Sequence, residues 1–347
     1  MGKRMTIKDI ARLAGVSVGA VSTAFSKKSS NVHLSEATRE KIFQVARENH
    51  YIPNIAARSM QTRKSYLLGF FYRMDNSYLQ AQILRGIREI CMKHEYDIIV
   101  YPCESLEDER YYLETLHVNQ LDGIITIPIL ENGKTNEVLY RRLADRGIPV
   151  IQILADLWKD MAMIGRDYPY IGYQSVKQLY AKGHCYIGAL MFHNYNDPKT
   201  GLNSTLLMEG IQRGVKEFNL KLEIYPLEKR ADSQYYFHEA ERAAEKILQS
   251  PEHPTALIAA SGRLAYGAYS CLTRHGLRVP EDISLLACGD DSEQFSQLAL
   301  NLSYFSVELE KIGILSARYC LERDQEYPLK QLLVSPFRKG DTIAELR

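Results

Sequence analysis

The sequence has 347 residues, which is too long for one ordinary hydrophobic core, so we expect two or three domains. With 46% hydrophobic and 24% charged residues, its composition is that of an ordinary globular protein, and no apolar run is long enough to cross a bilayer. The N-terminus has no apolar signal-peptide core and the six cysteines form no C-x-x-C pair. Secretion, a membrane anchor and a cysteine-based zinc or redox site are therefore disfavoured.

Charge is divided unevenly along the chain. Residues 1–66 hold 12 Lys and Arg against 4 Asp and Glu, whereas residues 67–347 hold 31 against 38. A basic head on an acidic body is typical of a nucleic-acid-binding module joined to a second domain. The alternative is a solvent-exposed basic surface with no binding partner. The sequence motifs distinguish between these two interpretations.

Two helices joined by a tight turn are predicted at the start of the head. Thr6 is placed to cap the first helix, and Asp9 three residues later completes a capping box. Apolar residues at helical spacing predict one buried face on this helix: Ile7, Ile10, Ala11 and Ala14. Gly15 then allows the turn, and Ser17 caps a second helix over residues 18–25.

A third helix is predicted from Ser35 to about Asn49. A helix, a glycine turn and a second helix form the helix-turn-helix, whose second helix enters the major groove of DNA. The run from Gly15 to Gly19 also matches the G-x-S-x-G nucleophile elbow of esterases. That elbow requires a buried strand before the serine, whereas an amphipathic helix precedes it here, so DNA reading is the favoured interpretation.

From residue 67 onward, predicted strands alternate with predicted helices in two successive sets. The strands of the first set begin near residues 67, 97, 123 and 149, and those of the second near 186, 221, 256 and 284. Repeated βα units of this length predict two doubly wound parallel sheets, and therefore two lobes with a ligand site between them. No dinucleotide fingerprint or phosphate loop appears, but composition alone does not separate such a body from an enzyme.

Several runs of sequence carry a family resemblance. The head contains TIKDIARLAGVSVGAVS, LSEATREKI and YIPNIAARSM within residues 6–64, and the body contains LDGII, AKGHCYIG and RVPEDISLLACGDD. With these runs the chain resembles the lactose-repressor (LacI/GalR) family of bacterial transcriptional regulators. The resemblance implies an all-α helix-turn-helix head with a hinge helix, followed by an α/β, two-lobed, periplasmic-binding-protein-like effector domain.

The resemblance also implies domain boundaries. Residues 1–50 would form the DNA-binding domain and residues 51–66 the hinge with its helix. The N-terminal lobe of the effector domain would take 67–163 and 307–331, and the C-terminal lobe 164–306 and 332–347.

Residues that would contact DNA follow from the same resemblance. Val18, Gly19 and Thr23 match base-reading positions, and Thr23 stands where the family usually has an arginine. Met60 matches the apolar wedge that the hinge helix inserts into the minor groove. The remaining expected contacts, most of them to the DNA backbone, are Thr6, Ser17, Ser22, Thr38, Asn54, Arg58 and Arg63.

The effector-binding residues that the resemblance implies are only partly retained in this sequence. Leu207 replaces an arginine that commonly clamps a sugar, and Leu154 replaces an acidic residue. The stacking aromatic matches either Tyr235 or Tyr236. The expected effector-binding residues are Tyr72, Arg73, Tyr78, Arg166, Tyr235, Ser261, Arg263 and Asp290. The arginines favour a carboxylate or phosphate on the effector, such as a sugar acid or sugar phosphate. Alternatively, they pair with acidic residues of the body such as Asp75 or Asp167.

We therefore expect a homodimeric transcriptional repressor, with an activator as the alternative, which binds palindromic operator DNA and a carbohydrate-related effector. It is expected to be cytoplasmic and nucleoid-associated, to need no cofactor or metal, and not to be an enzyme. One rival is a sugar-binding or enzymatic body with an incidental basic tail. The other is a regulator whose cleft binds no small molecule.

Overall fold

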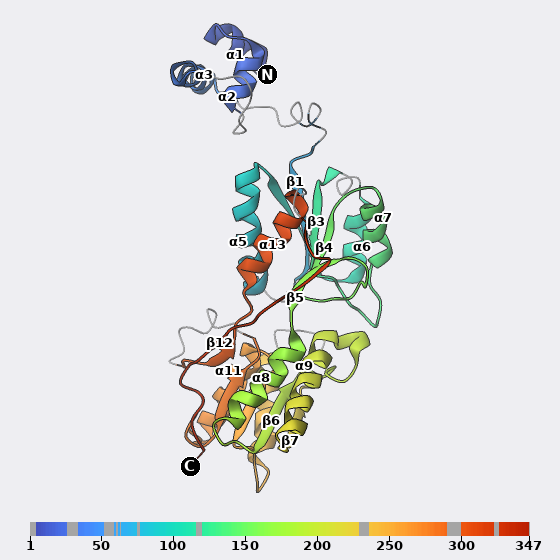
Figure 1. The fold of residues 1–347 in the computed structure, drawn as a ribbon, viewed down its shortest axis with the longest axis vertical. Coiled ribbons are helices and arrows are strands. Elements are labelled where there is room, and N and C mark those ends of the chain that lie inside the picture. Colours follow the sequence, from blue (N-terminus) through green and yellow to red (C-terminus); the bar gives the residue numbers. More distant parts are fainter. Residues whose placement is uncertain are drawn as a thin grey trace. The chain divides into compact units, whose positions relative to one another are not determined.

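The computed structural model forms two compact units, Met1–Ser65 and Tyr66–Arg347 (Figure 1). It describes residues 5–25, 34–51, 59, 62, 64–74, 77–115, 120–228, 236–289, 300–322 and 326–346. Within these ranges, no helix combines the length and the apolar character needed to cross a bilayer.

The first unit contains three short helices: α1 (Ile7–Ala14), α2 (Val18–Phe25) and α3 (Glu36–Glu48). The predicted capping box is confirmed, because the Thr6 hydroxyl accepts from the Asp9 amide and the Asp9 carboxylate accepts from Thr6. Gly15 has φ 67°, a left-handed conformation that glycine adopts without strain, and it ends α1. Ser35 caps α3 through the amide of Thr38. A small core holds the three helices together: Ile10, Ala11, Ala14, Val21, Ala24 and Ile42.

The second unit contains two six-stranded sheets. The first has the strand order β11-β5-β4-β3-β1-β2 and is parallel throughout. Its strands are β1 (Leu67–Arg73), β2 (Asp97–Cys103), β3 (Gly123–Thr126), β4 (Val150–Ile153), β5 (Ala162–Arg166) and β11 (Lys330–Leu333).

Helices cover both faces of the first sheet. In Figure 1, α5 (Ser77–His94) and α13 (Leu309–Leu321) lie together on one side, and α6 (Leu106–Glu114) and α7 (Glu137–Asp145) lie on the other. A Cβ on Gly86 of α5 would lie 2.0 Å from the main-chain oxygen of Glu310. Only glycine allows this approach, so Gly86 lets α5 and α13 pack closely.

The second sheet has the order β12-β10-β9-β8-β6-β7, with only β12 antiparallel. Its strands are β6 (Tyr186–Met191), β7 (Lys221–Pro226), β8 (Ala256–Ala259), β9 (Ser284–Ala287), β10 (Ser303–Phe305) and β12 (Phe337–Arg338). Its helices are α8 (Tyr168–Tyr180), α9 (Pro198–Glu217), α10 (Tyr236–Leu248) and α11 (Gly262–Arg274). The predicted strand starts at residues 186 and 221 are confirmed.

Sheet membership corrects two of the predicted lobe boundaries. β5 pairs with β4 and with β11, so both β5 and β11 belong wholly to the first sheet. The chain therefore crosses to the second lobe after Arg166 and again after Leu333, rather than at residues 163 and 331. β5 escapes sequence analysis because it ends in an arginine and is completed by a partner far along the chain.

Candidate functional site

The exposed face of α2 is the candidate DNA-reading surface. Val18 is 41% exposed, and Gly19 and Ser22 are also exposed, whereas Val21 on the opposite face is fully buried. Thr23 is half-buried. The exposed side chains are short and uncharged, so the helix backbone can approach another surface closely. An exposed apolar side chain such as Val18 suits contact with a thymine methyl group.

Polar residues flank this face. Ser17 accepts from the amide of Ala20 at 3.1 Å and so begins α2, while the Thr38 hydroxyl lies 2.8 Å from that of Ser35 at the start of α3. Thr6 caps α1. Each hydroxyl thus lies at a helix N-terminus, where main-chain amides favour an anion such as a phosphate. Four of the expected contacts lie outside the described residues: Asn54, Arg58, Met60 and Arg63.

The second unit holds a cavity of about 460 Å³ between the ends of its two sheets. The first sheet and its loops contribute Arg73, Gln80, Leu154, Leu157 and Arg166. The second contributes Phe192, Asn203, Leu207, Ser261 and Arg263. The side chains therefore come from both lobes, as expected for a ligand held between them.

Arg166 joins the two lobes at this cavity. It ends β5, it is 7% exposed, and its Nη2 donates to the main-chain oxygens of Cys288 at 2.7 Å and Phe305 at 3.4 Å. Its Nε donates to the Ser335 hydroxyl at 3.1 Å. The alternative pairing of Arg166 with Asp167 is not formed, because the Asp167 carboxylate caps α8 through the amide of Tyr170.

Comparison with known proteins now assigns both units. The model of bacterial regulatory proteins of the lacI family matches residues 6–54, and that of the periplasmic binding protein-like domain matches residues 176–342. The chain belongs to the LacI family of bacterial regulatory proteins. It is a DNA-binding transcriptional regulator and not an enzyme.

Relatives of this LacI-family chain align over most of their length. The repressor PurR of Vibrio vulnificus is 28% identical, with 88% of this chain and 86% of the relative covered. The ribose operon repressor of Haemophilus influenzae is 26% identical, covering 92% and 91%. The probable repressor ExuR of Bacillus subtilis is 27% identical, covering 98% and 95%.

Solved structures share the fold. A lac repressor dimer bound to operator and the anti-inducer ONPF superimposes with a TM-score of 0.78 at 23% identity, covering 99% of this chain and 100% of that one. A CelR–cellobiose complex gives a TM-score of 0.66 at 19% identity, covering 98% and 100%.

The cavity includes half of the effector-binding residues expected from the sequence of this LacI-family chain. Arg73, Arg166, Ser261 and Arg263 line it, whereas Tyr72 and Tyr78 do not. Tyr235 and Asp290 lie outside the described residues. Tyr236, the other expected stacking aromatic, is part of the lining.

The structure does not bring Tyr72 and Tyr78 to this cavity, and for Tyr72 the reason is the direction of its side chain. Successive side chains on a strand point to opposite faces, so Arg73 reaches the cavity while Tyr72 packs in the core against Phe70, with ring centroids 5.0 Å apart. Burial raises the pKa of Tyr72. Tyr78 lies beside a separate hollow near Glu308.

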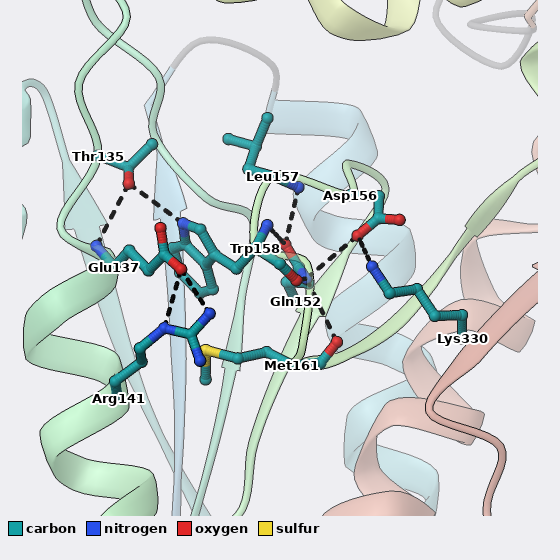
Figure 2. Close-up of polar contacts among 9 residues, drawn as sticks. All are labelled: Thr135, Glu137, Arg141, Gln152, Asp156, Leu157, Trp158, Met161 and Lys330. Carbon is teal, nitrogen blue, oxygen red and sulfur yellow. Dashed lines mark hydrogen bonds and ion pairs between the residues drawn. The ribbon is translucent and has the colours of Figure 1, made fainter.

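Sequence analysis did not anticipate Gln152, whose polar contacts are drawn in Figure 2. This fully buried side chain lies within β4, just before the loop that follows the strand. Its Oε1 accepts from the amides of Leu157 at 3.0 Å and Trp158 at 3.1 Å, and its Nε2 donates to the Trp158 oxygen at 2.7 Å. One carboxamide therefore fixes the loop that carries Leu154 and Leu157 into the cavity.

Two further contacts hold this loop in the LacI-family chain. The indole of Trp158 donates to the Thr135 hydroxyl at 3.2 Å, and Thr135 follows the second wall segment, residues 127–130. Lys330 at the start of β11 forms an ion pair with Asp156 (Figure 2). The two wall segments and β11, the strand before the crossing at Leu333, are thereby joined in one polar network.

Proposed function

We propose that this chain is a transcriptional repressor that binds a palindromic operator as a homodimer and changes its operator affinity when a small molecule occupies the cavity. The observation that carries the proposal is the exposed, uncharged face of α2, held by a capped helix-turn-helix within the residues that the lacI family model matches. A symmetric operator has two half-sites and so needs two heads. The dimeric lac repressor bound to its operator supports the same assembly.

Roles follow for the residues of the head. Val18, Gly19 and Thr23 read base edges, and Thr6, Ser17, Ser22 and Thr38 meet the DNA backbone. The hinge contributes the remaining contacts, with Met60 as an apolar wedge in the minor groove and with Asn54, Arg58 and Arg63 at the backbone. Such a regulator acts where its operator lies, on the chromosome in the cytoplasm.

The cavity is the proposed effector site. Its lining comes from both lobes, so an occupant contacts both and shifts the equilibrium between their relative positions. Support for a carbohydrate-related effector comes from a relative named as the ribose operon repressor and from a LacI-family structure with bound ribose. Arg73, Ser261 and Arg263 are the proposed polar contacts.

Selection of operator sequences tests the proposal. The full-length chain is incubated with random duplexes, and bound DNA is sequenced. We expect an imperfect palindrome. Thr23→Asp should abolish its capture, because a carboxylate then faces the DNA. The matched control, Thr273→Asp, changes an exposed threonine on α11 of the body and should leave capture unchanged. Recovery of no common sequence by the full-length chain would favour the rival, a ligand-binding body with an incidental basic tail.

A further inference from the structure

The walls of the cavity are mainly apolar. Leu79, Ile127, Ile129, Leu130 and Leu157 line the side of the first sheet. Phe192, Leu202, Leu207 and Val307 face them. Such walls hold an apolar surface of a ligand and offer nothing to a hydroxyl group.

Leu154 adds a further apolar side chain to the walls. It lines the cavity, it is 8% exposed, and its backbone has φ 68°. Asparagine and aspartate adopt this left-handed conformation more readily than leucine, and the resemblance places an acidic residue here. A leucine at this position therefore carries backbone strain while it supplies an apolar side chain to the wall.

Several polar side chains of the lining are already bonded within the protein. Asn194 Nδ2 donates to the Thr200 oxygen at 2.6 Å, and Asn203 Nδ2 donates to the Leu154 oxygen at 3.3 Å. Gln80 Nε2 donates to the Arg73 oxygen. Each of these amides therefore uses one of its two N–H donors within the protein, so fewer donors remain for the many hydroxyl groups of a neutral polyol, and each unpaired hydroxyl weakens binding.

The charged groups among the described lining residues are cationic. The described lining contains Arg73, Arg166 and Arg263 and no Asp or Glu. Arg73 is partly neutralised by Glu131, whose carboxylate lies 3.6 Å from its Nη1. The described hydrogen-bond partners of the buried Arg166 are uncharged oxygens. A buried cation among dipoles favours an anion nearby, and guanidinium groups hold carboxylate or phosphate through paired hydrogen bonds.

We infer that the cavity takes an amphipathic organic anion, a molecule with an extended apolar face and one carboxylate or phosphate. The inference rests on the proposed function for the role of the cavity as effector site. A carbohydrate-related effector fits only if it carries an acid group and presents an apolar face. The apolar part packs against Leu154 and Leu207. The acid group lies toward Arg263, which lines the cavity in the first turn of α11, where the main-chain amides of a helix N-terminus also favour an anion.

Four small molecules test separately the need for an apolar face and the need for an acid group. Phenylacetate has both, phenylacetamide only the apolar ring, ribose 5-phosphate only the anion, and ribose neither. Each is titrated into the full-length chain, and the emission of Trp158, the single tryptophan, reports binding because Leu157 beside it lines the cavity. We expect phenylacetate to bind at least about tenfold more tightly than each of the others. Equal or tighter binding of ribose or phenylacetamide, or no binding of phenylacetate at millimolar concentration, overturns the inference.

Variants locate the two contacts. Arg263→Gln should weaken the binding of phenylacetate about tenfold and leave the binding of phenylacetamide unchanged, because the substitution removes only a charge. Lys199→Gln, on an exposed cation of α9 outside the described lining, is the matched control and should change neither. Leu207→Asn should weaken both aromatic probes. Operator binding by each variant shows that it is folded. Loss of phenylacetate binding in Lys199→Gln but not in Arg263→Gln contradicts the assignment.

The operator assay separates this inference from the proposed function. If phenylacetate binds and operator affinity does not change, the proposed control of operator affinity by an effector is contradicted, whereas the inferred ligand class of the cavity is supported. If ribose binds more tightly than phenylacetate and changes operator affinity, the proposed regulatory function is supported and an amphipathic anion is excluded as the ligand.

Discussion

The Nη2 atom of Arg166 lies 2.7 Å from the main-chain oxygen of Cys288. Arg166 ends a strand of the first sheet, whereas Cys288 follows β9 of the second, so a single guanidinium holds both lobes beside the cavity. Its Nε also holds Ser335 on the last crossing between the lobes. Arg166 therefore sets the relative position of the lobes, in addition to any contact it makes with a ligand.

Removing this guanidinium should destabilise the second unit. Arg166→Met leaves the oxygens of Cys288 and Phe305 without this donor, and we expect a loss of about 2–4 kcal/mol in the free energy of unfolding. Urea unfolding followed by Trp158 fluorescence measures it. The control, Arg213→Met, removes an exposed guanidinium over the Tyr173 ring and should cost less than about 1 kcal/mol. Equal midpoints for the two variants would show that Arg166 does not tie the lobes.

Thr23 should read its base weakly, because it offers a methyl group and one hydroxyl where the family usually has arginine. Thr23→Arg should shift the preference at one position of each half-site toward G, by about 1–3 kcal/mol if both guanidinium hydrogen bonds form. Competition binding with operators changed one base pair at a time measures the shift. Thr273→Arg adds the same charge to the body and should alter no preference. An unchanged preference at every position would remove Thr23 from the reading surface.

Gln152 should be essential for the shape of the cavity wall. Gln152→Leu keeps the approximate size of the side chain but leaves the amides of Leu157 and Trp158 without their acceptor. We expect a loss of about 2–4 kcal/mol in the free energy of unfolding and a shift of Trp158 emission to longer wavelength as water reaches the loop. Gln212→Leu, on the exposed face of α9, should cost less than about 1 kcal/mol. Unchanged emission in Gln152→Leu would mean that the carboxamide does not position this wall.

The buried carboxyl of Glu109 should make stability depend on pH. Burial raises its pKa to about 7, although Tyr140 and Asn136 donate to its oxygens at 2.8 and 2.9 Å. An unfolded glutamate titrates near about 4.3. Between these two values the folded state retains a proton that the unfolded state has released. The free energy of unfolding therefore falls as pH rises from about 4.5 to about 7, by up to roughly 3 kcal/mol.

Glu109→Gln tests this dependence, since glutamine is uncharged and of similar size; its oxygen can accept from Asn136 while its amide donates to the Tyr140 hydroxyl. We expect the fall in stability across that window to flatten in urea unfolding measured at several pH values. Glu107→Gln, on the exposed face of α6, is the control and should keep the dependence of the parent chain. The same slope in all three proteins would show that Glu109 is not the group responsible.

The helices of the head and most strands of the body could be predicted because their signals are local. Thr6, Gly15 and Ser17 begin or end helices through contacts within a few residues, and the structure confirms all three. β5 could not be predicted, because its pairing with β11 joins segments far apart in the sequence. Non-local pairing leaves little trace in a short run of residues.

The candidate site was less accessible to sequence analysis. Adjacent residues such as Tyr72 and Arg73 point in opposite directions from one strand, so only Arg73 of the two reaches the cavity. Gln152 carried no motif, since its role depends on the conformation of the loop that it binds. The leucines at 154 and 207 were visible as departures from the family pattern, and the structure places both in the lining.

The central claim is that residues 1–66 read the operator. Fluorescence anisotropy with the selected duplex, at about 50 mM and about 200 mM salt, compares the full-length chain with a chain that begins at residue 67. The account predicts tight binding by the full-length chain that weakens steeply as salt rises, and no specific binding by the shortened one. Operator binding by the shortened chain that equals that of the full-length chain would contradict it.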